Sequence, residues 1–122
     1  MIEKKNFYIN GKWVSPYKPN DFEVIDPSTE EPFAIISLGS VEDTDRAISA
    51  AKSAFETWRE TGKEERLNLL EKFDQIYNRR WDEMVKAQST EMGAPLDFAS
   101  ETHTQMGADI SKNTIKILKD FN

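Results

Sequence analysis

The residues of this chain that could perform acid–base chemistry are one histidine and several carboxylates. His103 is the single histidine, and Glu101 is the nearest acidic residue in the sequence. A histidine that acts as a general base needs a nucleophile and an orienting group beside it. The pattern favours a helical histidine that is exposed or faces a cavity, and a small hydrolase that uses His103 with Glu101 is the weaker alternative.

Adjacent carboxylates occur at three places, Glu30–Glu31, Glu64–Glu65 and Asp82–Glu83. Such pairs can serve in acid–base catalysis or bind a divalent ion. Each of these pairs lies near an expected turn or helix start, where a negative charge is favourable by a few tenths of a kcal/mol or more. We therefore interpret them as solvated surface residues.

Two further kinds of chemistry lack the residues that they need. The 122 residues include no cysteine, which excludes disulfides, thiolate metal sites and a cysteine nucleophile in this chain. A nucleotide-binding loop needs closely spaced glycines between a strand and a helix, but the five glycines are scattered. We expect no cofactor to bind this chain alone.

Composition indicates a soluble chain of one domain or part of one, with 38% hydrophobic and 31% charged residues. The net charge is −6, and the basic residues form no cluster larger than a pair such as Arg79–Arg80, which argues against nucleic acid as a partner. The first ten residues have no apolar stretch after their lysines, and we expect no membrane-spanning segment. The prediction is a cytoplasmic protein.

The first segment, residues 1–39, is predicted to be β structure. Asn10–Gly11 separates two β-favouring runs within Phe7–Val14, which is typical of a hairpin with a type I′ turn. Phe22–Ile25 and Phe33–Ser37 read as a strand and a returning strand, separated by a turn rich in proline and acidic residues.

The second segment, residues 40–122, is predicted to be helical. Ser40 and Asp43 have the spacing of a capping box, and an apolar stripe follows from Ala47 to Trp58. We expect Gly62 to end this helix and Gly93 to cap a later one. The first helix is therefore predicted over about 40–61, and a second apolar stripe over 67–77 predicts the next helix. A third helix is predicted over about 82–92. The last is predicted from about residue 96, and Gly107 weakens its middle.

Four segments in the same order resemble the amino-terminal portion of the NAD(P)-dependent aldehyde dehydrogenase superfamily. They are Tyr8–Val14, Val24–Thr29, Val41–Trp58 and Glu91–Pro95. Each motif alone is weak, but four in register over nearly the whole chain are specific. Ala94 departs from the family pattern, in which a lysine usually precedes this proline. The resemblance implies an α+β fragment of an α/β fold, with N-terminal β-hairpins followed by three or four helices.

The resemblance also implies what a full-length parent would do. Such enzymes use NAD or NADP to oxidise an aldehyde to the acid, through a cysteine and a glutamate-activated water that would lie beyond Asn122. The chain ends directly after a helical pattern, so we expect it to be cut from a longer polypeptide, which would be its partner. Alone it should be inactive.

Family position assigns two candidate sites in this chain. His103 and Met106 correspond to residues that face the aldehyde entrance tunnel. The backbone carbonyls of Val24 and Ile25 with the carboxylate of Glu91 correspond to a monovalent cation site of structural role. Glu91 reads equally well as a solvated residue in the last turn of a helix.

One alternative of a different class stays open. The chain could be a stand-alone α-helical interaction module, in which the Ala47–Trp58 stripe and the Phe98–Phe121 face bind a partner.

Overall fold

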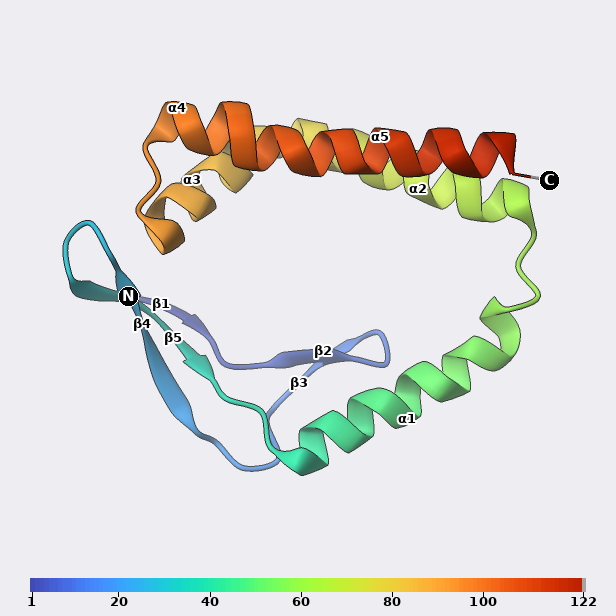
Figure 1. Cartoon of the computed structure of the whole chain (residues 1–122). Coiled ribbons are helices and arrows are strands. Elements are labelled where there is room, and N and C mark those ends of the chain that lie inside the picture. The colour runs from blue at the N-terminus through green and yellow to red at the C-terminus, as the bar shows by residue number, and fades with distance from the viewer. Residues whose placement is uncertain (122) are drawn as a thin grey trace. The chain divides into compact units, whose positions relative to one another are not determined.

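A computed structural model describes residues 1–121 of the chain (Figure 1). Its residues group into two compact units, one within Met1–Glu60 and the other from Thr61 onward. The secondary structure changes from strands to helices between Ser37 and Val41. The first unit therefore includes one helix besides the strands, and the expected division into segments 1–39 and 40–122 stays a prediction about domains.

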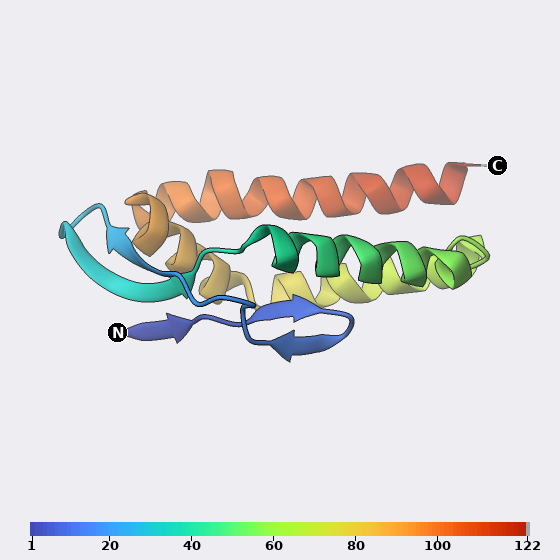
Figure 2. The same cartoon turned by 90° about the horizontal axis from the view of Figure 1, so that it is seen from below.

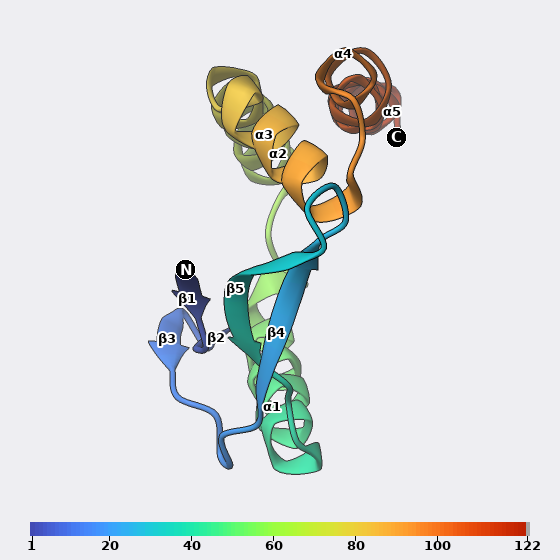
Figure 3. The same ribbon diagram turned by 90° about the vertical axis from the view of Figure 1, so that its left-hand side faces the viewer.

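The first unit contains a three-stranded sheet in the order β1-β5-β4, formed by Ile2–Lys4, Glu31–Ser37 and Asp21–Asp26. Strands β4 and β5 are antiparallel neighbours, as the sequence predicts, and Figure 3 shows them side by side. Strand β1 pairs with β5 in parallel and was not predicted. It is short and its partner lies about thirty residues away in the sequence, so local periodicity cannot reveal it.

The hairpin of the first unit consists of β2 (Phe7–Ile9) and β3 (Lys12–Val14), drawn in blue in Figure 2. Asn10 and Gly11 have φ of 53° and 73°, the two positive values that a type I′ turn requires. Tyr8 lies opposite Trp13, and their rings meet edge to face at 5.3 Å. The predicted hairpin is confirmed.

Helix α1 (Val41–Trp58) begins as predicted and ends earlier than predicted. Both hydrogen bonds of the capping box between Ser40 and Asp43 are present. The helix ends at Trp58, and Gly62 instead precedes helix α2 with φ −66° and ψ 158°. That extended backbone is open to any residue, so the glycine does not mark a left-handed helix end and the prediction for Gly62 was wrong.

The second unit is helical, with α2 (Lys63–Arg79), α3 (Trp81–Met92), α4 (Leu96–Phe98), η1 (Ala99–Thr104) and α5 (Gln105–Asp120). Gly93 ends α3 in the left-handed conformation with φ 69°, as predicted. Helix α5 packs along α2, and η1 packs against α3 (Figures 1 and 3). The predicted fold class, an α+β fragment with N-terminal hairpins followed by three or four helices, is confirmed.

The last helix differs from the prediction in its first third. Leu96–Asp120 runs as one continuous helix, orange to red in Figure 1, but the stretch Ala99–Thr104 is π-helical. A π-helical turn inserts extra backbone into a helix and is frequent at functional sites. The apolar pattern predicts the helix without the π turn, because periodicity does not report this insertion.

The two units have small cores. Among the described residues, the buried apolar side chains are Ala34, Leu67, Ala99 and Ala108. Many large apolar side chains are exposed, including Phe55, Phe73 and Ile117 at 55%, 56% and 66%. None of the described helices combines the length and apolar character that crossing a membrane requires.

Candidate functional site

The π-helical stretch is the segment that carries the candidate entrance residue His103, and two aromatic side chains hold it. Trp81 Nε1 donates a hydrogen bond to Ser100 Oγ at 3.1 Å. Tyr77 Oη donates to the backbone carbonyl of Thr104 at 3.0 Å. The two contacts fix both ends of η1 against α2 and α3.

Gly107 permits this arrangement. A Cβ at position 107 would overlap with Tyr77 Oη and would lie 2.9 Å from Tyr77 Cζ. The missing side chain therefore lets the tyrosine ring reach the carbonyl of Thr104, one turn earlier. The sequence indicates only a weakened helix at Gly107, whereas the structure gives this residue a packing role.

His103 lies on η1 and is half-buried. Its ring meets the ring of Phe98 edge to face at a centroid distance of 5.0 Å. Its Nδ1 atom is buried and has no hydrogen-bond partner within residues 1–121. No hydrogen bond or ion pair joins His103 to Glu101 among those residues, so the orienting contact that a histidine base needs is missing. The structure gives the hydrolase alternative no support.

Met106 lies in the first turn of α5, three residues after His103, and is 55% exposed. Its thioether is flexible and polarizable, which suits contact with apolar molecules of varied shape. The assignment of His103 and Met106 to an entrance tunnel stays a prediction, because the walls of such a tunnel would include chain beyond these residues.

The candidate cation ligands are divided between the two units. Val24 is half-buried and Ile25 is 43% exposed, and the β4–β5 register shifts between them. Such a bulge disrupts the ladder locally and can leave carbonyls available to a ligand. Glu91 lies exposed near the end of α3 in the other unit, so the three-residue set stays a prediction. No group of three or more histidine, cysteine or acidic residues placed to hold a metal ion occurs in the described part of the chain.

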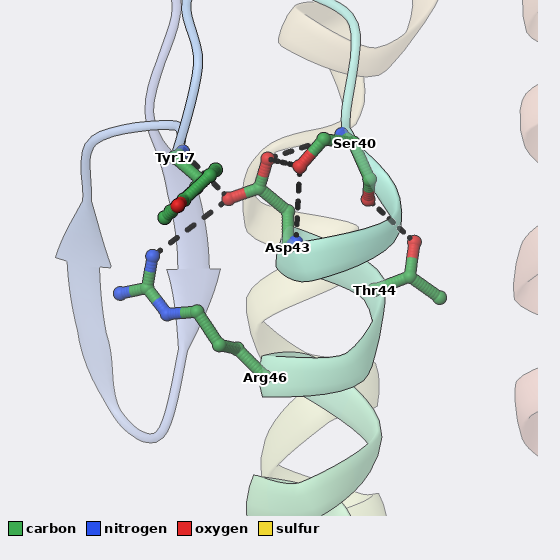
Figure 4. Close-up of polar contacts among 5 residues, drawn as sticks. All are labelled: Tyr17, Ser40, Asp43, Thr44 and Arg46. Carbon is green, nitrogen blue, oxygen red and sulfur yellow. Dashed lines mark hydrogen bonds and ion pairs between the residues drawn. The ribbon is translucent and has the colours of Figure 1, made fainter.

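A compact polar cluster surrounds Asp43 at the start of α1 (Figure 4). The residue is only 4% exposed. Its Oδ2 accepts hydrogen bonds from the backbone N–H of Ser40 at 3.0 Å and from Ser40 Oγ at 2.9 Å. Its Oδ1 accepts from the backbone N–H of Tyr17 at 2.8 Å, and Arg46 Nη1 lies 3.8 Å away. Asp43 therefore fastens the loop after β3 to the helix start.

These contacts lower the pKa of Asp43 below its ordinary value. The backbone N–H of Ser40 is the largest cause, burial acts in the opposite direction, and the N–H of Tyr17 adds to the lowering. The carboxylate also occupies the N-terminal end of α1, where a phosphate would otherwise be attracted. The β5–α1 connection therefore does not fit the phosphates of NAD, in keeping with the absence of a glycine-rich loop.

Comparison with known proteins gives the context of these features. The family model described as "Aldehyde dehydrogenase family" matches residues 13–122. A 3-succinoylsemialdehyde-pyridine dehydrogenase from Pseudomonas sp. is 39% identical over all of this chain and 26% of its own length. A solved aldehyde dehydrogenase from Bartonella henselae superposes with a TM-score of 0.98 and 51% identity, over all of this chain and 26% of that one.

A second solved relative shows a bound cofactor. Aldehyde dehydrogenase C from Pseudomonas syringae, determined with NAD+ and octanal, is 32% identical with a TM-score of 0.94, over 97% of this chain and 24% of that one. The fold and these matches place the chain in one protein family. The chain belongs to the aldehyde dehydrogenase family and corresponds to the amino-terminal region of its fold. It spans about a quarter of the length of these relatives.

The predicted family resemblance is thus confirmed, whereas the sequence gives no role to the residues that hold η1. Apolar periodicity alone assigns neither Tyr77 nor Trp81 a polar partner. The available signal is their spacing of four residues together with the tyrosine hydroxyl and the indole N–H, because a buried tyrosine or tryptophan usually finds a hydrogen-bond partner.

Proposed function

We propose that this chain is the amino-terminal part of an NAD(P)-dependent aldehyde dehydrogenase that oxidises an aldehyde to the acid. One observation carries the proposal: the whole chain superposes on a quarter of a solved aldehyde dehydrogenase with a TM-score of 0.98. The chain supplies scaffold and part of the substrate entrance, and it is inactive alone because it contains no cysteine nucleophile.

In this proposal the entrance contribution comes from the start of the last helix. Met106 and the ring pair of His103 and Phe98 offer apolar surface to the carbon chain of a small aldehyde. Tyr77 and Trp81 fix the position of that surface through their hydrogen bonds to η1. The remainder of the polypeptide would bind NAD or NADP, which would supply the hydride acceptor.

The cation site is part of the same proposal. The carbonyls of Val24 and Ile25 at the β4 bulge and the carboxylate of Glu91 would hold a monovalent cation in the complete enzyme. Oxygen atoms are the ligands that hard cations prefer. The role of the cation would be structural.

The proposed setting is the cytoplasm, with the remaining aldehyde dehydrogenase polypeptide as partner and neither nucleic acid nor a membrane involved. The net charge of −6 supports the exclusion of a phosphate backbone. We also keep the division into a β segment, 1–39, and a helical segment, 40–122, as a proposal about domains.

Complementation tests this function. The chain is mixed with the separately expressed carboxyl-terminal part of the Bartonella henselae relative, and aldehyde-dependent formation of NADH or NADPH is measured. We expect turnover only in the mixture. Turnover by the purified chain alone would contradict the proposal. Absence of turnover in a mixture of folded components would also contradict it. In that second case, a compact monomeric chain would favour the stand-alone interaction module.

A further inference from the structure

A hollow lies between the β2–β3 hairpin and helix α1, both of which belong to the first unit. Its volume is about 550 Å³, within the range of sites that bind small molecules. Apolar side chains from both elements, Ile9, Val14 and Ala50, line part of it, and polar or charged side chains line the rest. The hollow can therefore receive a molecule that has an apolar body and a polar end.

The register of the hairpin places a lysine beside the apolar lining. Lys12 lies directly opposite Ile9, and Val14 follows two residues later, so the three side chains project from the same face of the hairpin. Ile9 and Val14 are half-buried, whereas Lys12 is exposed. Lys12 Nζ forms no hydrogen bond or ion pair within residues 1–121. Its ammonium group is therefore available to a ligand in the hollow.

Helix α1 supplies a second cation to the lining. Arg46 precedes Ser49 by three residues and Ala50 by four, so all three lie on one side of the helix. Figure 4 shows the Arg46 side chain reaching toward the hairpin. Its Nη1 atom forms an ion pair with Asp43 Oδ1 at 3.8 Å, a distance longer than a hydrogen bond. The guanidinium group therefore keeps N–H donors for a ligand.

The charge of the hollow differs from that of the whole chain. Lys12 and Arg46 contribute positive charges to the lining and Asp45 contributes a negative one, whereas the chain has a net charge of −6. Asp45 forms no ion pair with either cation in the described part of the chain. Asn10 and Ser49 add an amide and a hydroxyl group, both of which can donate hydrogen bonds. Two cationic side chains with further donors nearby favour an anionic group.

We propose that this hollow binds an organic carboxylate that carries an apolar chain. The carboxylate lies between Lys12 and Arg46, and the apolar chain lies against Ile9, Val14 and Ala50. An inorganic anion would leave the apolar lining in contact with water, and an alcohol would leave the two cations without a counter-ion. All of the lining residues belong to the first unit, and the inference does not rest on the proposed function.

Octanoate is the test ligand, with octanol as its uncharged counterpart and with acetate and inorganic phosphate as anions that lack the chain. Binding to the chain is measured by calorimetry, and NMR chemical shifts of the backbone amides locate the site. We expect octanoate to bind more tightly than the other three compounds. It should shift the amides of Lys12 and Ser49, which lie on the two sides of the hollow.

Two variants and a matched control test the role of the cations. Lys12→Gln and Arg46→Gln should each weaken octanoate binding by about tenfold. Lys12→Gln is the decisive variant, because no hydrogen bond or ion pair of the folded chain is lost with this lysine. Lys52→Gln, at an exposed position of α1 outside the lining, should leave binding unchanged. Circular dichroism verifies that all three variants keep the helix content of the parent chain.

The proposal is overturned if octanoate does not bind, if it shifts only amides outside the hollow, or if it binds equally well to folded Lys12→Gln. Equal affinity for octanol would mean that only the apolar lining takes part. Equal affinity for acetate or phosphate would mean that only the cations take part. Either of these results would also overturn the assignment to an organic carboxylate.

Discussion

At the scale of single residues, Asp43 shows how one carboxylate can join local and distant backbone. The sequence predicts its pairing with Ser40, because a capping box is a local pattern. The contact with the N–H of Tyr17, 26 residues earlier, depends on the loop that returns to the helix start and is visible only in the structure. The residue therefore has more partners than a helix cap alone.

Replacement of Asp43 by alanine should destabilise the first unit. The change leaves the N–H groups of Ser40 and Tyr17 without their acceptor. We expect the midpoint of thermal unfolding, measured by circular dichroism, to fall by several degrees. The control is Asp45→Ala on the exposed side of the same helix, and an equally large fall in that variant would contradict the specific role of Asp43.

The contribution of Asp43 to stability should depend on pH. Its pKa is lower in the folded chain than the unfolded value of about 3.9, so the contribution is complete above that value and is lost as the pH falls through the folded pKa. The difference in urea midpoint between the parent chain and Asp43→Ala should stay constant above about pH 5 and shrink in more acidic solution. A difference that grows on acidification would refute this assignment.

At the scale of elements, the π turn of η1 is maintained by side chains from two other helices. Tyr77 and Trp81 lie near the α2–α3 junction, and their rings contact each other edge to face at 6.3 Å. Their donor atoms reach Thr104 and Ser100 at the two ends of η1. The geometry of η1 is thus set by packing between helices.

Tyr77→Phe should weaken this attachment without a change in ring packing. Loss of the hydrogen bond to the carbonyl of Thr104 should cost about 1 kcal/mol in the free energy of unfolding. Amide hydrogen exchange should become faster in η1. Tyr8→Phe, at a residue that is 64% exposed, serves as the control and should alter neither quantity.

Gly107→Ala should destabilise the chain, although alanine is the better helix former by about 1 kcal/mol. The new Cβ would displace the ring of Tyr77 and break its bond to Thr104. A double-mutant cycle with Tyr77→Leu, followed by urea unfolding, checks the cause. The cost of the alanine should diminish in the leucine background, and an unchanged cost would exclude Tyr77 as the source.

At the scale of the whole molecule, apolar surface exceeds what the two small cores can bury. The largest side chains on α1, α2 and α5 include several that are more than half exposed, among them Phe55, Phe73 and Ile117. Extended apolar exposure on a soluble chain marks a surface that meets a partner. The solved relative from Bartonella henselae, of which this chain covers 26%, is about four times as long.

The folded chain should therefore bind a hydrophobic fluorescent dye, and the carboxyl-terminal part of the Bartonella henselae relative should displace it. Dye fluorescence is followed during titration, with circular dichroism to verify that helix content is retained. An unrelated globular protein serves as the negative control and should not displace the dye. Absence of dye binding to the folded chain would show that the exposed apolar residues do not form a continuous surface.

Features that depend on neighbouring residues and on chain length were predictable from the amino-acid sequence. The Asn10–Gly11 hairpin, the capping box at Ser40 and the left-handed end at Gly93 follow from the conformational demands of a few adjacent positions. The four ordered motifs indicated the family, and the absence of cysteine excluded the family's nucleophile from this chain.

Features that join distant residues became visible only in the folded chain. Three contacts each bridge 26 residues or more: the pairing of β1 with β5, the hydrogen bond between Tyr17 and Asp43, and the hydrogen bond from Tyr77 to the carbonyl of Thr104. The apolar pattern of α5 shows which residues favour burial, but it does not show which face of the helix packs against α2. Periodicity reports the faces of an element, whereas the choice of partner depends on how the chain folds back on itself.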